Sequence, residues 1–277
     1  GVHVPSWCVA LILFGILSKS ATFPLHSWLP DAGVAPSPVT SLLHAAVLVK
    51  IGVYAYARLF VATFTVDPVF THIVPIIAAV SALISAGCAM VETDLKRIIA
   101  YSTISQLAFI LLGVSIGNET GLVGGMLYIL AHSVAKGGLF LCAGIVEHNL
   151  HTKDINKMGG LYKRFPLTAV AFALCSLSVM GVPPFSGFFA KYFVVQGALA
   201  ANQPWIAGVF ILGAFMTVFY LSRVFFKVFL GPETDHHAHE HSRGMVGSVV
   251  FLGILALALG VFISLPAELA SRIWEVL

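Results

Sequence analysis

Long apolar runs separated by short polar segments are the feature that most limits what this chain can fold into. Runs of about 17–25 apolar residues are long enough to cross a membrane as helices. We find eight, at residues 7–29, 39–60, 72–91, 97–117, 121–147, 165–200, 204–230 and 245–265. Only 10% of the 277 residues are charged and 58% are hydrophobic, whereas soluble domains carry about 25% charged residues. The sequence therefore predicts an all-α polytopic membrane protein in which residues 1–277 form a single membrane domain.

The basic residues between the spans predict the orientation of the chain. Basic loop residues collect on the cytoplasmic side of membrane proteins. One side of the predicted spans holds Lys96, Arg97, Lys153, Lys157, Lys163, Arg164 and Arg243, with Arg223 and Lys227 at a helix end. The other side holds only Arg58 and Arg272. We therefore expect a multi-pass protein of the cell membrane with the lysine- and arginine-rich loops in the cytoplasm. Both chain ends would then lie on the outer side.

The sixth run, 165–200, is too long for one straight span. As a helix it would measure about 54 Å, against a hydrocarbon core of about 30 Å. Pro183 and Pro184 lie near its middle, and proline removes a backbone donor and clashes with the preceding turn. We expect two half-helices joined by a short unwound segment. A kinked or tilted helix with an amphipathic tail is the alternative.

The first run shows a milder form of the same pattern. Lys19 is followed by Ser20, Thr22 and Pro24, and Pro24 cannot lie inside an unbroken helical hydrogen-bond ladder. The sequence therefore predicts a second discontinuous helix around Pro24. Transporters often carry two such helices in corresponding places of an internal repeat.

Ionisable residues near the middle of the spans are the main functional signal. A charge at the bilayer centre costs about 2.5–3.5 kcal/mol on insertion scales. By counting the helical rise, four lysines fall at such depths, and two histidines accompany them: Lys19, His44, Lys50, His132, Lys136 and Lys191. Buried lysine and histidine can both bind and release protons. The set predicts a proton path, although any one lysine could instead be a structural donor to a neighbouring helix.

No motif on this chain predicts a cofactor, a metal site or nucleic-acid binding. There is no phosphate-binding loop, no dinucleotide fingerprint and no C-x-x-C among the four cysteines. The net charge of +3 is too small to indicate nucleic acid. The tract His236–His241 is rich in metal-binding side chains, but we expect it to be a solvated loop.

Several separated motifs resemble one protein family. They are KSATFPLHSWLPDAGVAPSPVTSLLHAAVLVKIGVYAYAR, DLKRIIAYSTISQLAF and MGVPPFSGFFAK. They are similar to the antiporter-like subunits of respiratory complex I, of Mrp-type cation/proton antiporters and of membrane-bound hydrogenases. The resemblance implies a fourteen-helix subunit with two inverted five-helix repeats, of which this chain holds the seventh helix onward. Residues 1–60 would end the first repeat, 72–230 would form the second, and 245–265 would be the final helix.

The resemblance also implies roles for the mid-span residues. Lys19 matches the lysine of the broken seventh helix, at the first half-channel. Lys50 resembles the connecting residue of the eighth helix. His132 and Lys136 match the ionisable positions of the eleventh helix, and Lys191 matches the lysine of the broken twelfth helix, at the second half-channel.

The family pairs its seventh-helix lysine with a glutamate on the fifth helix, which this sequence does not contain. We therefore expect partner membrane subunits, or further residues of a longer or split protein, to supply the N-terminal helices and that glutamate.

Two functions follow as expectations. The first is a proton-translocating subunit, with or without sodium exchange, of a redox-driven or Mrp-type complex whose catalytic centre lies on another chain. The alternative is a structural membrane anchor of the same complex. A stand-alone transporter is disfavoured because half of the repeat pair is absent. The stretch MGGLYKRFPLTAVAF favours a hydrogenase- or Mrp-like assembly over complex I.

Overall fold

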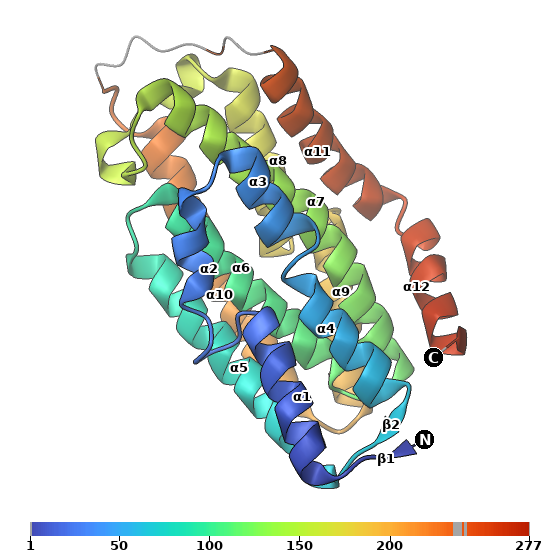
Figure 1. Ribbon diagram of the computed structural model, residues 1–277. Coiled ribbons are helices and arrows are strands. Elements are labelled where there is room, and N and C mark those ends of the chain that lie inside the picture. Colours follow the sequence, from blue (N-terminus) through green and yellow to red (C-terminus); the bar gives the residue numbers. More distant parts are fainter. Residues whose placement is uncertain (1, 235–239, 241–242, 277) are drawn as a thin grey trace.

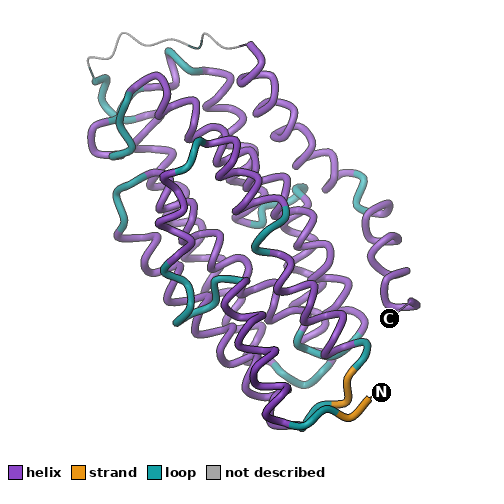
Figure 2. The backbone as a smooth tube through the Cα atoms, in the orientation of Figure 1, coloured by secondary structure: helices purple, strands orange, loops and turns teal. Residues whose placement is uncertain are grey.

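Helices make up nearly all of the regular structure. The computed structural model describes residues 2–234, 240 and 243–276. Within these ranges the only strands are β1 (Val2–His3) and β2 (Phe64–Thr65), which pair in parallel. The rest of the described chain in Figure 2 is helix or short loop. The prediction of an all-α membrane protein is confirmed.

Long apolar helices form the body of the bundle. Among the residues that the structure describes, six helical stretches are long and apolar enough to cross a membrane: Ser37–Val61, α5 (Pro68–Val91), α6 (Leu95–Val114), α7 (Glu119–Leu150), Pro204–Leu230 and α11 (Arg243–Val261). The stretch Pro204–Leu230 consists of α10 (Pro204–Phe225) and a π-helical turn (Phe226–Leu230). Helices α6 and α7 are buried along most of their length, so they form the core. Large apolar side chains point outward from the peripheral helices, among them Ile76, Phe215 and Phe251, as expected of a surface that faces lipid.

The two predicted discontinuous helices are confirmed. The first span consists of α1 (Ser6–Lys19) and α2 (Trp28–Asp31), which continues into a 3₁₀ turn (Ala32–Val34). The sixth consists of α8 (Pro166–Met180) and α9 (Ser186–Ala200). Backbone freed at such breaks must find partners inside the protein. At the first break, the Trp28 indole donates to the Ser18 carbonyl (3.1 Å) and the Phe23 amide donates to the Ser81 hydroxyl (3.0 Å).

An interruption in the second span was not predicted. Instead of one helix over 39–60, the chain forms α3 (Ser37–Ser41), a π-helical turn (Leu42–Ala46), α4 (Lys50–Tyr56) and a second π-helical turn (Ala57–Val61). Residues 47–49 between them are not helical. The interruption lies directly before Lys50.

A separate helix follows the last span. Helix α11 ends at Val261, shortly before the predicted end at residue 265, and α12 (Ser264–Val276) follows it. Gly260 packs against the backbone of Phe185 and Ser186, at the break between α8 and α9. Helix α12 continues beyond this contact, and Figure 1 shows α11 and α12 lying one after the other along one side of the bundle.

The two ends of the bundle differ in charge. The loop between α7 and α8 carries the 3₁₀ turns Ile155–Lys157 and Leu161–Lys163, and it lies beside the turn between α5 and α6, since Asp94 and Asp154 form a β-bridge. We call this end, with Lys96, Arg97 and residues 151–165, the basic end. The tract His236–His241 lies outside the described residues except for Glu240, whose carboxylate accepts a hydrogen bond from the Thr168 amide (2.7 Å).

Candidate functional site

Helix α7 carries a row of buried polar and aromatic side chains. Tyr128, His132, Lys136 and Phe140 follow one another at intervals of four residues, so they lie on one side of the helix. All four are buried, and Lys136 is completely inaccessible. The predicted pair His132 and Lys136 therefore belongs to a continuous line through the middle of the bundle.

Lys136 reaches from α7 to α6. Its ammonium donates to the Ile99 carbonyl oxygen (3.3 Å) and to the Ser102 hydroxyl. A buried charge is tolerable only when such partners replace water. The two contacts place the Lys136 nitrogen between α6 and α7.

Lys50 lies on the other side of α7. As the first residue of α4, it donates to the Ala45 carbonyl just before the interruption and to the Ser133 hydroxyl on α7. Ser133 directly follows His132 in the sequence of α7. Lys50 therefore contacts α7 at the level of His132.

The two buried histidines have free ring nitrogens. Neither nitrogen of His44 or of His132 has a hydrogen-bond partner among the described residues. The His44 ring stands edge-on to Phe140, with 4.9 Å between ring centroids. Buried polar atoms are normally satisfied, often by internal water. Both rings are therefore places where we expect water to join the line.

Lys191 closes the end of a half-helix. Its ammonium donates to the carbonyl oxygens of Val179 (2.7 Å) and Met180 (3.0 Å), the last residues of α8. Carbonyls at a helix C-terminus are unpaired and carry partial negative charge. The same ammonium lies 5.9 Å from the centroid of the Tyr128 ring, within the range of a cation–π contact. Lys191 therefore joins the row on α7 at Tyr128.

Lys19 stands apart from the other three lysines. It is the last residue of α1 and its side chain is exposed. Among the described residues its ammonium has no hydrogen-bond or ion-pair partner. The structure thus brings His44, Lys50, His132, Lys136 and Lys191 together around α7, and leaves Lys19 on the surface at the first helix break.

A buried chain of hydroxyl groups and one amide was missed by the sequence analysis. Ser102 and the Tyr220 hydroxyl are 2.6 Å apart, and Tyr220 donates to Thr217 (3.4 Å). The Gln106 amide nitrogen donates to Thr217 (3.2 Å), and its oxygen accepts from the Tyr128 hydroxyl. The chain connects α6, α7 and α10. The polar residues of the stretch YSTISQ, inside an apolar span, were the available signal.

A polar cavity of about 880 Å³ opens at the basic end. Its residues include Ser37, Lys96, Glu147, His148, His151 and Lys153. Glu147 pairs with Lys96 (2.6 Å) and Lys153 (3.3 Å). The sequence placed Lys96 in a surface turn, but its side chain is only 4% exposed. Glu147 was not singled out because it falls at the end of a predicted span.

The cavity leads toward the buried row. Ser37, one of its lining residues, packs against Gly144 on α7. One turn deeper, the Ser41 hydroxyl donates to the Gly137 carbonyl oxygen (3.2 Å). Small and hydroxyl-bearing residues therefore connect the cavity to the level of Lys136.

Glu92 organises the turn between α5 and α6. Partial burial acts to raise the pKa of its carboxyl. The Thr93 and Asp94 amides and the Arg97 guanidinium, which donate hydrogen bonds to it, outweigh that effect and leave its pKa below the ordinary value. Arg97 also pairs with Asp31 (3.1 Å). These contacts tie the turn to the end of α2.

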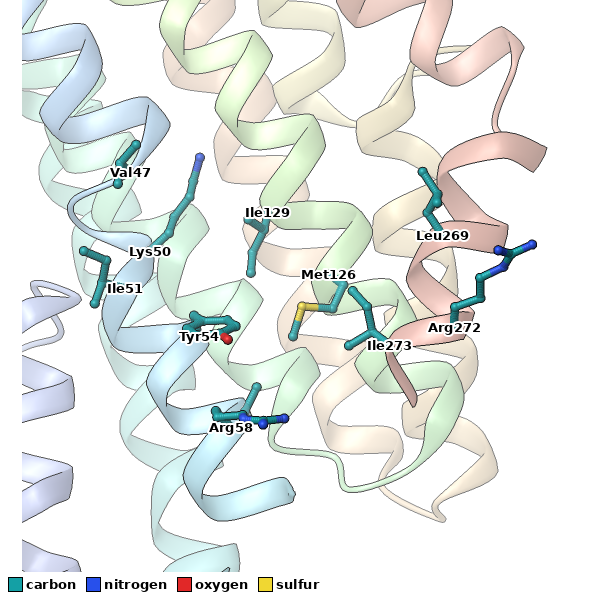
Figure 3. A pocket seen from close by; sticks show the side chains of 11 residues that line it. Val47, Lys50, Ile51, Tyr54, Arg58, Met126, Ile129, Leu269, Arg272 and Ile273 are labelled. Carbon is teal, nitrogen blue, oxygen red and sulfur yellow. The ribbon is translucent and has the colours of Figure 1, made fainter. Parts of the chain in front are cut away.

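A mainly apolar groove of about 650 Å³ leads from Lys50 to the other end of the bundle. Figure 3 shows Lys50 and Arg58 on one wall and Leu269, Arg272 and Ile273 of α12 on the opposite wall. Arg272 pairs with Glu268 (2.8 Å). Lys50 thus lies at the inner end of an open groove, unlike Lys136.

Comparison with known proteins gives consistent matches. A family model described as NADH:quinone oxidoreductase/Mrp antiporter, TM, matches residues 3–217. NADH-quinone oxidoreductase subunit L of Campylobacter jejuni is 38% identical over 257 residues, covering 92% of this chain and 42% of the relative. F(420)H(2) dehydrogenase subunit L of Methanosarcina mazei is 38% identical over 276 residues, covering 94% and 41%.

A solved structure of an Mrp complex from Dietzia sp. DQ12-45-1b contains a similar chain. It superposes with a TM-score of 0.90 at 27% identity, covering 96% of this chain and 58% of that one. The chain spans about two fifths of the length of the curated relatives it matches. Both oxidoreductase and Mrp proteins match, so the comparisons do not distinguish between these assemblies.

Proposed function

The chain belongs to the NADH:quinone oxidoreductase/Mrp antiporter transmembrane family, and on this premise we propose that it is a proton-translocating subunit of a multisubunit membrane complex. The observation that carries the proposal is the line around α7, in which the buried His132 and Lys136 of this helix are joined by the buried Lys50 and the half-buried Lys191 within about four turns. Four ionisable groups in one apolar interior are costly, and function is the usual reason for retaining them.

The cavity at the basic end supports the view that protons enter the bundle from that end. Its polar residues can collect protons from water, and Ser37 and Ser41 lead from it toward Lys136. We propose that the basic end faces the cytoplasm, as the positive-inside rule requires. Protons would then pass along the row on α7 to Lys191.

The exposure of Lys19 indicates that another helix packs against α1. An uncompensated lysine on the surface of a membrane bundle is unfavourable, and a carboxylate from another helix would neutralise it. We propose that a segment of a longer protein, or a partner subunit, covers α1 and supplies this carboxylate. Residues 1–60 and 72–230 would then belong to two successive repeats.

The alternative function, a structural anchor, makes a different prediction. The three lysines of the line, Lys50, Lys136 and Lys191, all donate to backbone carbonyls, which is also how a purely structural donor would bind. In that case, replacing them would alter stability but not transport. Sodium exchange would not change the roles of these residues in binding protons.

Proton uptake by vesicles that contain the intact complex tests the proposal. Lys136→Ala and Lys191→Ala should abolish driven uptake while the complex still assembles. Lys163→Ala is the matched control, because Lys163 is exposed in a loop at the basic end and pairs only with Glu233 among the described residues. Native uptake in both buried-lysine variants would refute transport and leave the anchor function.

A further inference from the structure

The hydroxyl chain beside α7 connects two lysines of the line, the buried Lys136 and the half-buried Lys191. It starts at Lys136, which donates to Ser102, and continues through Tyr220 and Thr217. On the far side of the Gln106 amide it ends at Tyr128, over whose ring the Lys191 ammonium lies. Lys136 and Lys191 are therefore linked by side chains of the described core alone.

Every member of this chain is inaccessible to solvent. Ser102, Gln106 and Thr217 are completely buried, and Tyr128 and Tyr220 nearly so. They come from α6, α7 and α10, so their meeting results from tertiary packing. Buried hydroxyls held in a row can pass protons, because each accepts one hydrogen and donates another.

The Gln106 amide within the hydroxyl chain cannot pass a proton in this way. Its nitrogen donates to Thr217 and its oxygen accepts from Tyr128, and an amide nitrogen neither ionises nor accepts a hydrogen bond. A proton given up by Lys136 can displace one along Ser102 and Tyr220 to Thr217. Thr217 donates its own hydrogen to the Gly213 carbonyl oxygen (2.7 Å), and its next neighbour in the hydroxyl chain, the Gln106 nitrogen, presents only hydrogens to it. If the Gln106 amide were turned by 180°, its nitrogen would face Tyr128 and its oxygen would face Thr217. The nitrogen would still be unable to accept a proton, so transfer would stop at Tyr128 instead of at Thr217.

We propose that Gln106 is an insulating junction between Lys136 and Lys191. It holds the hydroxyls on both sides in position and prevents protons from running between the two lysines along this row. Such a block has a purpose in any driven translocation, because a path open to both sides at once lets protons flow back down the gradient. This role rests on the proposed function, since an anchor has no gradient to protect.

Because Gln106 blocks the hydroxyl chain, His132 is the group that transfers protons between Lys136 and Lys191. It lies on the same side of α7, one turn from Lys136 and one turn from Tyr128. Both of its ring nitrogens are unpaired among the described residues, so it can accept a proton at one nitrogen and release one at the other. Gln106 is thus a positioning residue, and the histidine carries the proton.

Two variants of the same length separate these roles. Gln106→Glu places a carboxyl between Thr217 and Tyr128, which can take a proton from one and release it to the other. Gln106→Met keeps the volume but removes the hydrogen bonds. We expect vesicles with the Glu variant to leak protons several-fold faster than native vesicles when the complex is not driven, and vesicles with the Met variant to remain tight.

Three controls complete the experiment. Ser105→Ala should leave the resting leak unchanged, because this buried neighbour donates to the Ala82 carbonyl outside the row (2.8 Å). Adding Lys136→Ala to Gln106→Glu should abolish the leak, since it removes the lysine at which the hydroxyl chain starts. Tyr220→Phe, which does not alter position 106, should retain most of the driven uptake because the hydroxyl chain is not the conduit.

Each outcome either supports the junction or overturns it, and support requires that none of the overturning results is seen. A leak in the Glu variant alone, lost with Lys136→Ala, supports the junction. Equal behaviour of the Glu and Met variants overturns it, as does loss of driven uptake in Tyr220→Phe to the level of Lys136→Ala. If driven uptake is instead native in Lys136→Ala and Lys191→Ala, the proposed function itself has failed.

Discussion

The ammonium of Lys191 donates a 3.0 Å hydrogen bond to the carbonyl oxygen of Met180, across the break that divides the sixth span. One half-helix therefore supplies the cation that satisfies the C-terminal end of the other. This arrangement stabilises an unwound backbone inside the membrane and places an ionisable group at the break.

Removing this cation should affect both stability and transport. Lys191→Met leaves the carbonyls of Val179 and Met180 without a donor, which costs about 1–3 kcal/mol. Lys191→Arg retains a donor and should lose less stability. Thermal unfolding of the purified complex measures the difference. Equal stability of the Met and native proteins would contradict the role of Lys191 as a cap.

A side chain at position 181 should lower both stability and transport. Its φ is +86°, and a Cβ would lie 2.9 Å from Cδ of Lys191. Gly181→Ala should therefore cost about 1–2 kcal/mol from the backbone alone and also displace Lys191, lowering driven uptake. Gly208→Ala is the control, because nothing lies within 4 Å of its Cβ position. The prediction fails if both variants unfold and transport like the native protein.

The ion pair between Lys96 and Glu147 should be sensitive to removal of one partner. Lys96 is buried, so Glu147→Gln leaves an uncompensated charge and should destabilise by up to about 3 kcal/mol, at the low end for buried pairs because Glu147 is partly exposed. The double variant Lys96→Met/Glu147→Gln should recover most of the loss. A double variant less stable than Glu147→Gln would show that the charge of Lys96 is not the cause.

Acid should loosen the turn that contains Glu92. The pKa of its carboxyl is lower in the folded protein than in the unfolded chain, so its stabilising contribution is present above about pH 4.3 and is lost as pH falls through the lower folded value. Hydrogen exchange in residues 92–97, corrected for intrinsic rates, should accelerate in that range. Glu92→Gln should remove this acid transition; its persistence would show that Glu92 is not the cause.

The sequence predicted the features that depend on local chemistry. The breaks in the first and sixth spans follow the prolines Pro24, Pro183 and Pro184, which remove backbone donors there. The sequence did not predict the interruption before Lys50, because residues 47–49 contain neither proline nor glycine. There the ammonium of Lys50 binds the Ala45 carbonyl and Ser133 of α7, which is a tertiary effect.

The hydroxyl chain escaped prediction for a different reason. Serine, threonine, tyrosine and glutamine cost much less in a membrane than a charge, so they do not stand out in an apolar span. Only packing shows that Ser102, Tyr220 and Thr217 meet, since they lie on α6 and α10. The burial of Lys96 likewise depends on Glu147 from α7.

The central claim is that protons cross the bundle along α7. The most direct test is the number of protons moved per turnover of the driving reaction, compared between the native complex and Lys136→Ala at equal amounts of assembled complex. The account predicts that this ratio falls sharply in the variant while assembly is retained. An unchanged ratio would contradict it, because Lys136 is the most deeply buried lysine of the line.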